Sequence, residues 1–257
     1  MSELKLTRRF LENLYKKYNQ PNSAEDPVWN VLVQKDIVDQ EILAFISATY
    51  AFGNIRQINR SLFKIIELLS PSAYQRILDL DYIFYLERNF EVKHRFLSHQ
   101  EFIGLLKSLN VIYTHHVSLK KLFLLNYKPD DKNLKEAIIH FSKNLRELIH
   151  KQDPHLKKIK FLFPSPESGS ACKRINLFLR WMVRKDNVDL GLWREIKTSQ
   201  LIIPLDVHIY RVARHFQLTR LKRPSWNMAM EITESLKNFD AYDPVKYDFA
   251  LSHINIE

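Results

Sequence analysis

Lys173 and Asp206 are the two residues of this sequence whose types and positions best fit covalent chemistry. Lys173 begins a segment dense in apolar residues, which predicts a buried helix with the lysine in its first turn. The positive end of the helix dipole disfavours a cation there. A desolvated, partly neutral lysine is a nucleophile, and a fixed carboxylate stabilises developing positive charge. The alternative is a solvated lysine and an ordinary helix cap.

The elements that must position these two residues are predicted to be helices. Asp206 follows Pro204 and precedes an apolar pattern, so we expect it to cap a helix that ends near Phe216. Residues 4–19 predict an amphipathic helix with a basic face. Asp39 and Gly53 are expected to open and close the next one. Further helices are expected at 55–70, capped by Asn54, and at 226–236, capped by Ser225, as well as at 71–78, 102–125, 134–149 and 245–253.

The composition favours a globular helical protein with a polyanionic partner. The chain has 257 residues and only four glycines, whereas average glycine usage is about 7% and sheets with tight turns need more. A net charge of +10 fits a nucleic-acid backbone, although solubility alone would also explain it. No apolar run spans a membrane and no signal peptide is recognisable, so we expect a cytoplasmic protein without membrane contact.

Two motifs resemble the helix-hairpin-helix DNA glycosylases of the endonuclease III superfamily. Residues 204–214, Pro-Leu-Asp-Val-His-Ile-Tyr-Arg-Val-Ala-Arg, resemble the segment Val-Asp-Thr-His-Val-x-Arg-Val of that superfamily. Residues 169–179, Gly-Ser-Ala-Cys-Lys-Arg-Ile-Asn-Leu-Phe-Leu, resemble the end of its hairpin, Gly-x-Gly-x-Lys-Thr-Ala-Asn. The resemblance implies that Lys173 is a Schiff-base nucleophile and that Asp206 is the essential carboxylate.

The chain also departs from endonuclease III. The hairpin turn Leu-Pro-Gly-Val-Gly is absent, and the separation between lysine and aspartate is longer, which resembles the archaeal 8-oxoguanine glycosylases. Over nearly its whole length, with Ser-Ala-Cys-Lys-Arg at 170–174 and Asp-Pro-Val-Lys-Tyr-Asp-Phe-Ala-Leu at 243–251, the chain resembles an uncharacterised bacterial family, known by a domain-of-unknown-function label and usually grouped with these glycosylases.

The single cysteine, Cys172, excludes an internal disulfide and a four-cysteine iron–sulfur cluster, so no cofactor is expected. His115 and His116 are adjacent and would point about 100° apart on a helix, which argues against a shared metal ion. We therefore expect neither a cofactor nor a metal.

The resemblance implies an all-α, two-lobed fold like that of the helix-hairpin-helix glycosylases, with a degenerate hairpin. We expect residues 37–155 to form a barrel-like lobe. Residues 1–36 and 156–257 would form the second lobe, with the N-terminal helix packed on the C-terminal one and the ligand between the lobes. We expect a monomer.

Candidate contacts to double-stranded DNA lie in three places. A phosphate is expected at the helix start formed by Gly169, Ser170, Ala171 and Arg174, next to the basic run Lys157, Lys158 and Lys160. In the superfamily, the loop near the end of the first helical pair faces DNA, which makes Tyr50, Phe52 and Gly53 candidates for probing the duplex, with core aromatics next to a helix stop as the alternative. Trp181 and Trp193 are candidates for stacking on a flipped base, with core packing as the alternative for both.

Three functions remain open on the sequence. The first is a base-excision-repair glycosylase, with or without lyase activity, that flips a damaged base out of double-stranded DNA. The second is a non-catalytic module that binds distorted duplexes. The third is a helical protein-interaction domain whose positive charge is incidental.

Overall fold

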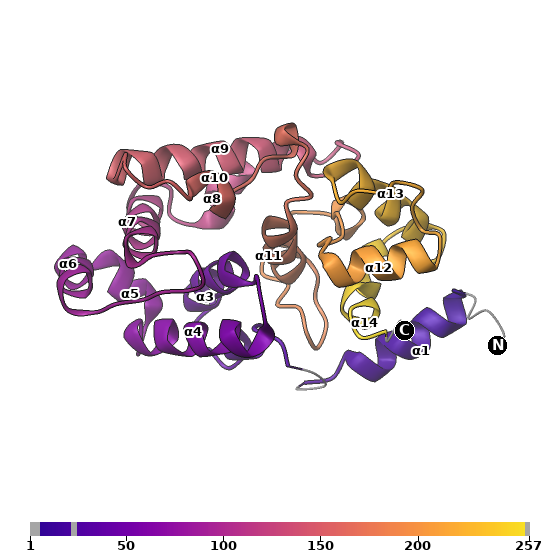
Figure 1. Cartoon of the computed structure of the whole chain (residues 1–257), viewed down its shortest axis with the longest axis horizontal. Coiled ribbons are helices and arrows are strands. Elements are labelled where there is room, and N and C mark those ends of the chain that lie inside the picture. Colours follow the sequence, from indigo (N-terminus) through magenta and orange to yellow (C-terminus); the bar gives the residue numbers. More distant parts are fainter. Residues whose placement is uncertain (1–5, 22–24, 255–257) are drawn as a thin grey trace. The chain divides into compact units, whose positions relative to one another are not determined.

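The computed structural model describes residues 6–21 and 25–254, and every regular element within these ranges is a helix (Figure 1). The only strand-like pairings there are two isolated bridges, His94 with Leu97 and Lys185 with Leu190. The predicted all-α fold class is therefore confirmed, whereas the helix-hairpin-helix assignment stays a prediction. None of the helices described is both long enough and apolar enough to cross a bilayer.

The chain divides into two compact units. Unit 1 comprises Met1–Glu25, Pro129–Leu134 and Pro166–Glu257, and unit 2 comprises Asp26–Lys128 and Lys135–Ser165. The prediction of two domains, 37–155 and 1–36 with 156–257, stays a prediction.

Unit 2 is built around the buried helix α3 and the longer helices α7 and α9. Helix α7 packs directly on α9, and α5 contacts both α3 and α7. Glu41 of α3 is buried, and its Oε2 accepts hydrogen bonds from Tyr113 Oη (2.6 Å) and from the Leu119 N–H (3.0 Å). The carboxylate thus ties α3 to α7 and to the start of α8. The helices of this unit are α2 (Trp29–Leu32), α3 (Ile37–Tyr50), α4 (Ile55–Leu68), α5 (Ala73–Leu78), α6 (Leu80–Asn89), α7 (His99–His115), α8 (Leu119–Leu124), α9 (Lys135–Gln152) and α10 (Ile159–Leu162).

Two details of unit 2 differ from the prediction. Asp36, not Asp39, caps α3; Asp39 is buried in the first turn, where it accepts hydrogen bonds from Ser72 Oγ (3.1 Å) and the Tyr74 N–H (2.7 Å). The single helix expected at 102–125 is interrupted at Val117, whose φ of 71° lies in the left-handed region and separates α7 from α8.

In helix α11 of unit 1, every residue after Lys173 is buried. The N-terminal helix packs on the C-terminal one, as predicted, and Glu12 accepts hydrogen bonds from Tyr247 Oη (2.6 Å) and Lys246 Nζ (2.8 Å). The helices are α1 (Arg8–Tyr18), α11 (Lys173–Val183), α12 (Val207–His215), α13 (Trp226–Lys237) and α14 (Asp248–Leu251), with short 3-10 helices at Pro166–Ser168, Thr198–Gln200 and Pro244–Tyr247.

Candidate functional site

Lys173 is the first residue of α11, in the first turn as predicted, and it is half-buried. The chain reaches it through a sharp turn, in which Gly169 has a φ of 76° and Cys172 a φ of 49°. The turn is fixed to the start of α13, because the Trp226 N–H donates to the Gly169 carbonyl (3.0 Å). Asn176 Nδ2 donates to the Ala171 carbonyl (3.0 Å). The position of Lys173 is thus set by the hydrogen-bonded turn that precedes it as well as by α11.

Asp206 is the N-cap of α12, as predicted. Its Oδ1 accepts a hydrogen bond from the Ile209 N–H (2.8 Å), and α12 ends at His215, one residue before the expected end. The residues before it, 201–205, are buried and hold this helix start in unit 1. Asp206 itself is half-buried, so one carboxylate oxygen holds the cap while the side chain remains within reach of a ligand.

Asp248, the first residue of α14, connects these two positions. It is 4% exposed and accepts a hydrogen bond from Arg180 Nη1 (2.5 Å). Burial raises the pKa of the Asp248 carboxyl to about 6; the attraction of Arg180 and Lys173 opposes this shift and the repulsion of Asp206 adds to it. Lys173, Asp206 and Asp248 therefore interact electrostatically, and we call them the Lys–Asp–Asp cluster. Helix α12 also packs directly on α14.

Arg180 anchors Asp248 from the same helix that begins with Lys173. Residues seven positions apart lie two turns apart on one face of a helix, so Arg180 is on the side of α11 that bears Lys173. Its Nε also donates to Asp189 Oδ1 (3.0 Å). Arg184, one turn later, contacts Asp189 and pairs through Nε with Asp243 Oδ1 (2.9 Å). A buried ionic network thus holds Arg180, and through it Asp248, in place.

Asp248 is not among the site residues predicted from the sequence. The signal that could have found it is a carboxylate within the apolar run Tyr-Asp-Phe-Ala-Leu. A charge at a buried position must be paired, and here the partner is Arg180.

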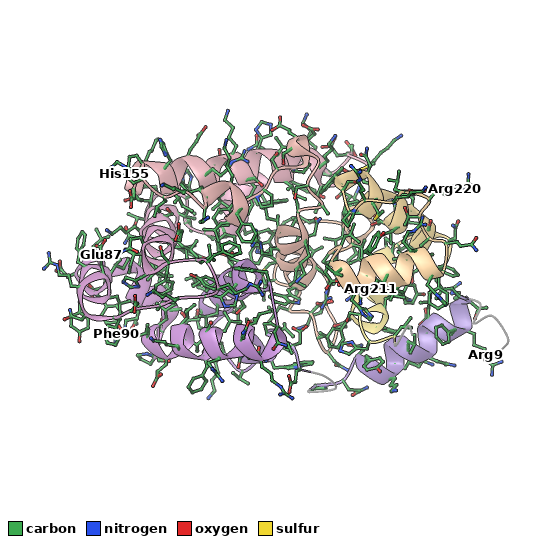
Figure 2. The ribbon with its side chains drawn as sticks, viewed as in Figure 1. Arg9, Glu87, Phe90, His155, Arg211 and Arg220 are labelled. Carbon is green, nitrogen blue, oxygen red and sulfur yellow. The ribbon has the colours of Figure 1, made fainter. Side chains whose placement is uncertain are left out.

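The predicted DNA contacts of unit 1 have different exposures. Arg174 is only 8% exposed, and burial lowers its pKa to about 10, so its predicted phosphate contact would require a rearrangement of this side chain. Trp181 and Trp193 are fully buried, as the core-packing alternative predicts, and Trp193 meets Phe178 edge to face. Arg211 on α12 and Arg220 in the following loop are exposed (Figure 2).

The other predicted contacts lie in unit 2. Lys157, Lys158 and Lys160 are all exposed, Phe52 is half-buried and Tyr50 is buried. Gly53 has a φ of 103° and lies two residues beyond the C-cap of α3, one residue later than expected. The basic run and the Gly169 turn belong to different units, so a phosphate site shared between them stays a prediction. Among the described residues, no group of three or more His, Cys, Asp or Glu side chains is arranged to hold a metal ion.

Comparison with known proteins identifies one family. The family model described as "Protein of unknown function (DUF2400)" matches residues 26–257. No curated protein and no solved structure matches the chain. This confirms the expected membership of an uncharacterised family, whereas the relation to the glycosylases stays a prediction. The match covers both units apart from the N-terminal segment, and the chain belongs to the DUF2400 family.

Proposed function

We propose that this chain is a DNA base-excision-repair glycosylase in which Lys173 is the nucleophile and Asp206 is the essential carboxylate. The observation that carries the proposal is the Lys–Asp–Asp cluster: a lysine and an aspartate at two helix starts of one unit both interact with the same buried carboxyl group. The two motif resemblances point to the same pair. The helix-hairpin-helix fold is part of this proposal.

The chemistry requires an uncharged amine at Lys173. The positive end of α11 disfavours the ammonium form, whereas Asp206 and Asp248 favour it. A carboxylate beside the lysine also provides an acceptor for the ammonium proton. The proton can then leave Nζ when a substrate displaces water from the cluster.

At C1′ the reaction breaks two bonds and forms the two bonds of a carbon–nitrogen double bond. The Nζ lone pair attacks the sugar C1′, and the C1′–N bond to the damaged base breaks, so that the base leaves with the bonding electrons and takes up a proton. Nζ, now a secondary ammonium, loses one proton, and its lone pair forms a second bond to C1′ as the C1′–O4′ bond opens. O4′ takes up a proton, and a protonated imine then joins Nζ to C1′. Asp206 stabilises the positive charge that develops on the sugar. Elimination from the imine would cut the strand.

Double-stranded DNA is the partner that fits the charge of the chain. The net charge is +10, and the exposed Arg211 and Arg220 place positive charge on the unit that contains the cluster. Helix α11 begins without a side-chain cap, and N–H groups at a helix start favour a phosphate. These features support the predicted contacts of Gly169, Ser170 and Ala171 with the phosphate backbone of DNA.

Borohydride trapping tests the proposal. Duplexes with an abasic site, 8-oxoguanine or uracil are incubated with the protein and sodium borohydride, which reduces the imine to a stable amine. We expect a covalent adduct with wild type and none with Lys173→Ala. Lys173→Arg is the matched control, because it keeps the charge and should retain DNA binding without an adduct. Asp206→Asn should slow trapping about 100-fold, since Asn remains a good N-cap but lacks the charge.

The outcomes separate the three functions. Salt-dependent DNA binding without an adduct on any of these duplexes, unchanged in Lys173→Ala and Asp206→Asn, would support the non-catalytic module that binds distorted DNA. Absence of DNA binding at low salt would support the protein-interaction domain. Full trapping by Lys173→Ala would refute the assigned nucleophile.

A further inference from the structure

Three phenylalanines from distant parts of the sequence form a ring cluster in unit 2. Phe52 follows α3, Phe96 lies between α6 and α7, and Phe161 belongs to α10. The ring centroids of Phe96 and Phe161 are 4.7 Å apart, and Phe52 lies 5.5 Å from Phe96 and 5.0 Å from Phe161. Phe96 is 47% exposed and Phe161 38% exposed. We call these three rings the aromatic platform, because aromatic surface of the cluster is open to solvent.

A tight turn holds Phe96 in the platform. The His94 N–H donates to the Leu97 carbonyl (3.2 Å), and the Leu97 N–H donates to the His94 carbonyl (2.9 Å). Arg95, with a φ of 55°, and Phe96 are the two residues at the tip of this turn. A large apolar side chain at the tip of a closed two-residue turn cannot bury itself against its own turn, so the Phe96 ring stays accessible to a ligand.

His94 fixes the turn to the loop after α3. It is buried, and its Nε2 donates to the Phe52 carbonyl (3.0 Å) while its Nδ1 lies 3.0 Å from Ser61 Oγ. Because a carbonyl oxygen only accepts, Nε2 carries the ring proton. Burial lowers the pKa of His94 and favours the neutral ring that these contacts need. The support of the platform is therefore polar and specific, although its outer surface is apolar.

Positive side chains surround the platform. Lys158 Nζ lies 5.6 Å from the centroid of the Phe96 ring, and Lys157 and Lys160 beside it are exposed. Arg95 lies against Gly53, where an added Cβ would be 2.6 Å from Arg95 Nη1 and 2.8 Å from its Cδ. The absence of a side chain at Gly53 thus makes room for the arginine. The acidic residue nearest in sequence to the turn, Glu91, pairs with Lys93 (2.5 Å).

We propose that the aromatic platform binds an unpaired nucleobase of a DNA strand, with Arg95 and Lys158 contacting the adjoining phosphates. Exposed rings bordered by cations match a nucleic-acid strand, because each nucleotide offers a flat π face next to a negative charge. An apolar peptide would leave the cations without partners. The choice of DNA rests on the proposed function, whereas the stacking geometry does not depend on Lys173.

The test measures stacking directly, with full-length protein and a single-stranded 15-mer that contains 2-aminopurine. Stacking of 2-aminopurine on an aromatic ring quenches its fluorescence. We expect quenching by wild type, and about 5- to 150-fold weaker binding by Phe96→Ala, the range found when a base loses one aromatic partner. Phe96→Leu should weaken binding similarly, because it keeps apolar bulk but lacks a π face. Lys158→Ala should reduce the slope of log K against log salt by about 0.7.

Phe63→Ala is the matched control, because Phe63 is 69% exposed on α4 of the same unit and lies outside the platform. Far-ultraviolet circular dichroism checks the fold of each variant. Equal binding by Phe96→Ala and Phe63→Ala, or binding by wild type without quenching, would overturn the platform. Quenching without a borohydride adduct would reject the proposed enzyme and keep the platform, and an adduct without quenching would reject the platform alone.

Discussion

Asp248→Asn provides a quantitative test of the Lys–Asp–Asp cluster. The Asp248 pKa is raised from 3.8 to about 6 in the folded chain, and 1.36 kcal/mol per pKa unit makes ionisation of this group cost about 3 kcal/mol of folding free energy. The folded state binds the proton more tightly than the unfolded state. The stabilisation of the folded state by protonated Asp248 is therefore fully present below pH 4 and is lost as the pH rises through 6.

Asparagine at position 248 does not titrate, although its side-chain oxygen can still accept from Arg180. The quantity to compare is the free energy of unfolding of Asp248→Asn minus that of wild type. The substitution also has an effect that does not depend on pH, but we expect this difference to increase by about 3 kcal/mol as the pH rises. Most of the increase should fall between pH 4 and 7. Urea denaturation followed by circular dichroism, at several pH values in this range, measures the difference.

Asp81→Asn is the control, because Asp81 is exposed in the first turn of α6. The difference from wild type should depend more steeply on pH for Asp248→Asn than for Asp81→Asn. A pH-independent difference for Asp248→Asn would refute the assignment of a buried carboxyl with a raised pKa at position 248. A difference that decreases with pH would show that Arg180 overcompensates the desolvation of Asp248.

Three further stability predictions follow from single positions, each measured as a free energy of unfolding at pH 7. Asp206→Ala should cost about 1 kcal/mol through loss of the α12 cap, whereas Asp206→Asn should cost a few tenths. Gly53→Ala should cost more than Gly169→Ala, because both have positive φ but only at Gly53 would a Cβ clash, with Arg95; equal costs would contradict this reasoning. Trp193→Ala should cost about 3–5 kcal/mol, and a smaller loss would mean that the indole is not in the core.

Several helix starts were predictable because their signals are local. Asn54, Asp206 and Ser225 cap α4, α12 and α13 as expected, since a cap depends on one side chain and the N–H groups two or three residues later. The same rule misplaced the start of α3. Both Asp36 and Asp39 fit the local pattern, and contacts of Asp39 with α5 decided between them.

The candidate site was predictable only in part. Lys173 and Asp206 stand next to recognisable helix starts, whereas only tertiary contacts link Asp248 to them: α14 packs on α12, and Arg180 of α11 donates a hydrogen bond to Asp248. The aromatic platform also escaped prediction. Its rings come from three segments that are far apart in the sequence, and no local pattern links Phe96 with Phe161.

The sequence by itself determined the helical class, most helix starts, the excess of positive charge and the lysine–aspartate pair, because each depends on composition or on residues within one or two helical turns. The tertiary structure decided which charges are buried, which carboxyl shares the electrostatic environment of Lys173, and which phenylalanines meet at the surface of unit 2. Burial and long-range contact depend on the packing of distant segments, and the free-energy cost of removing a charge from water exists only after that packing has formed.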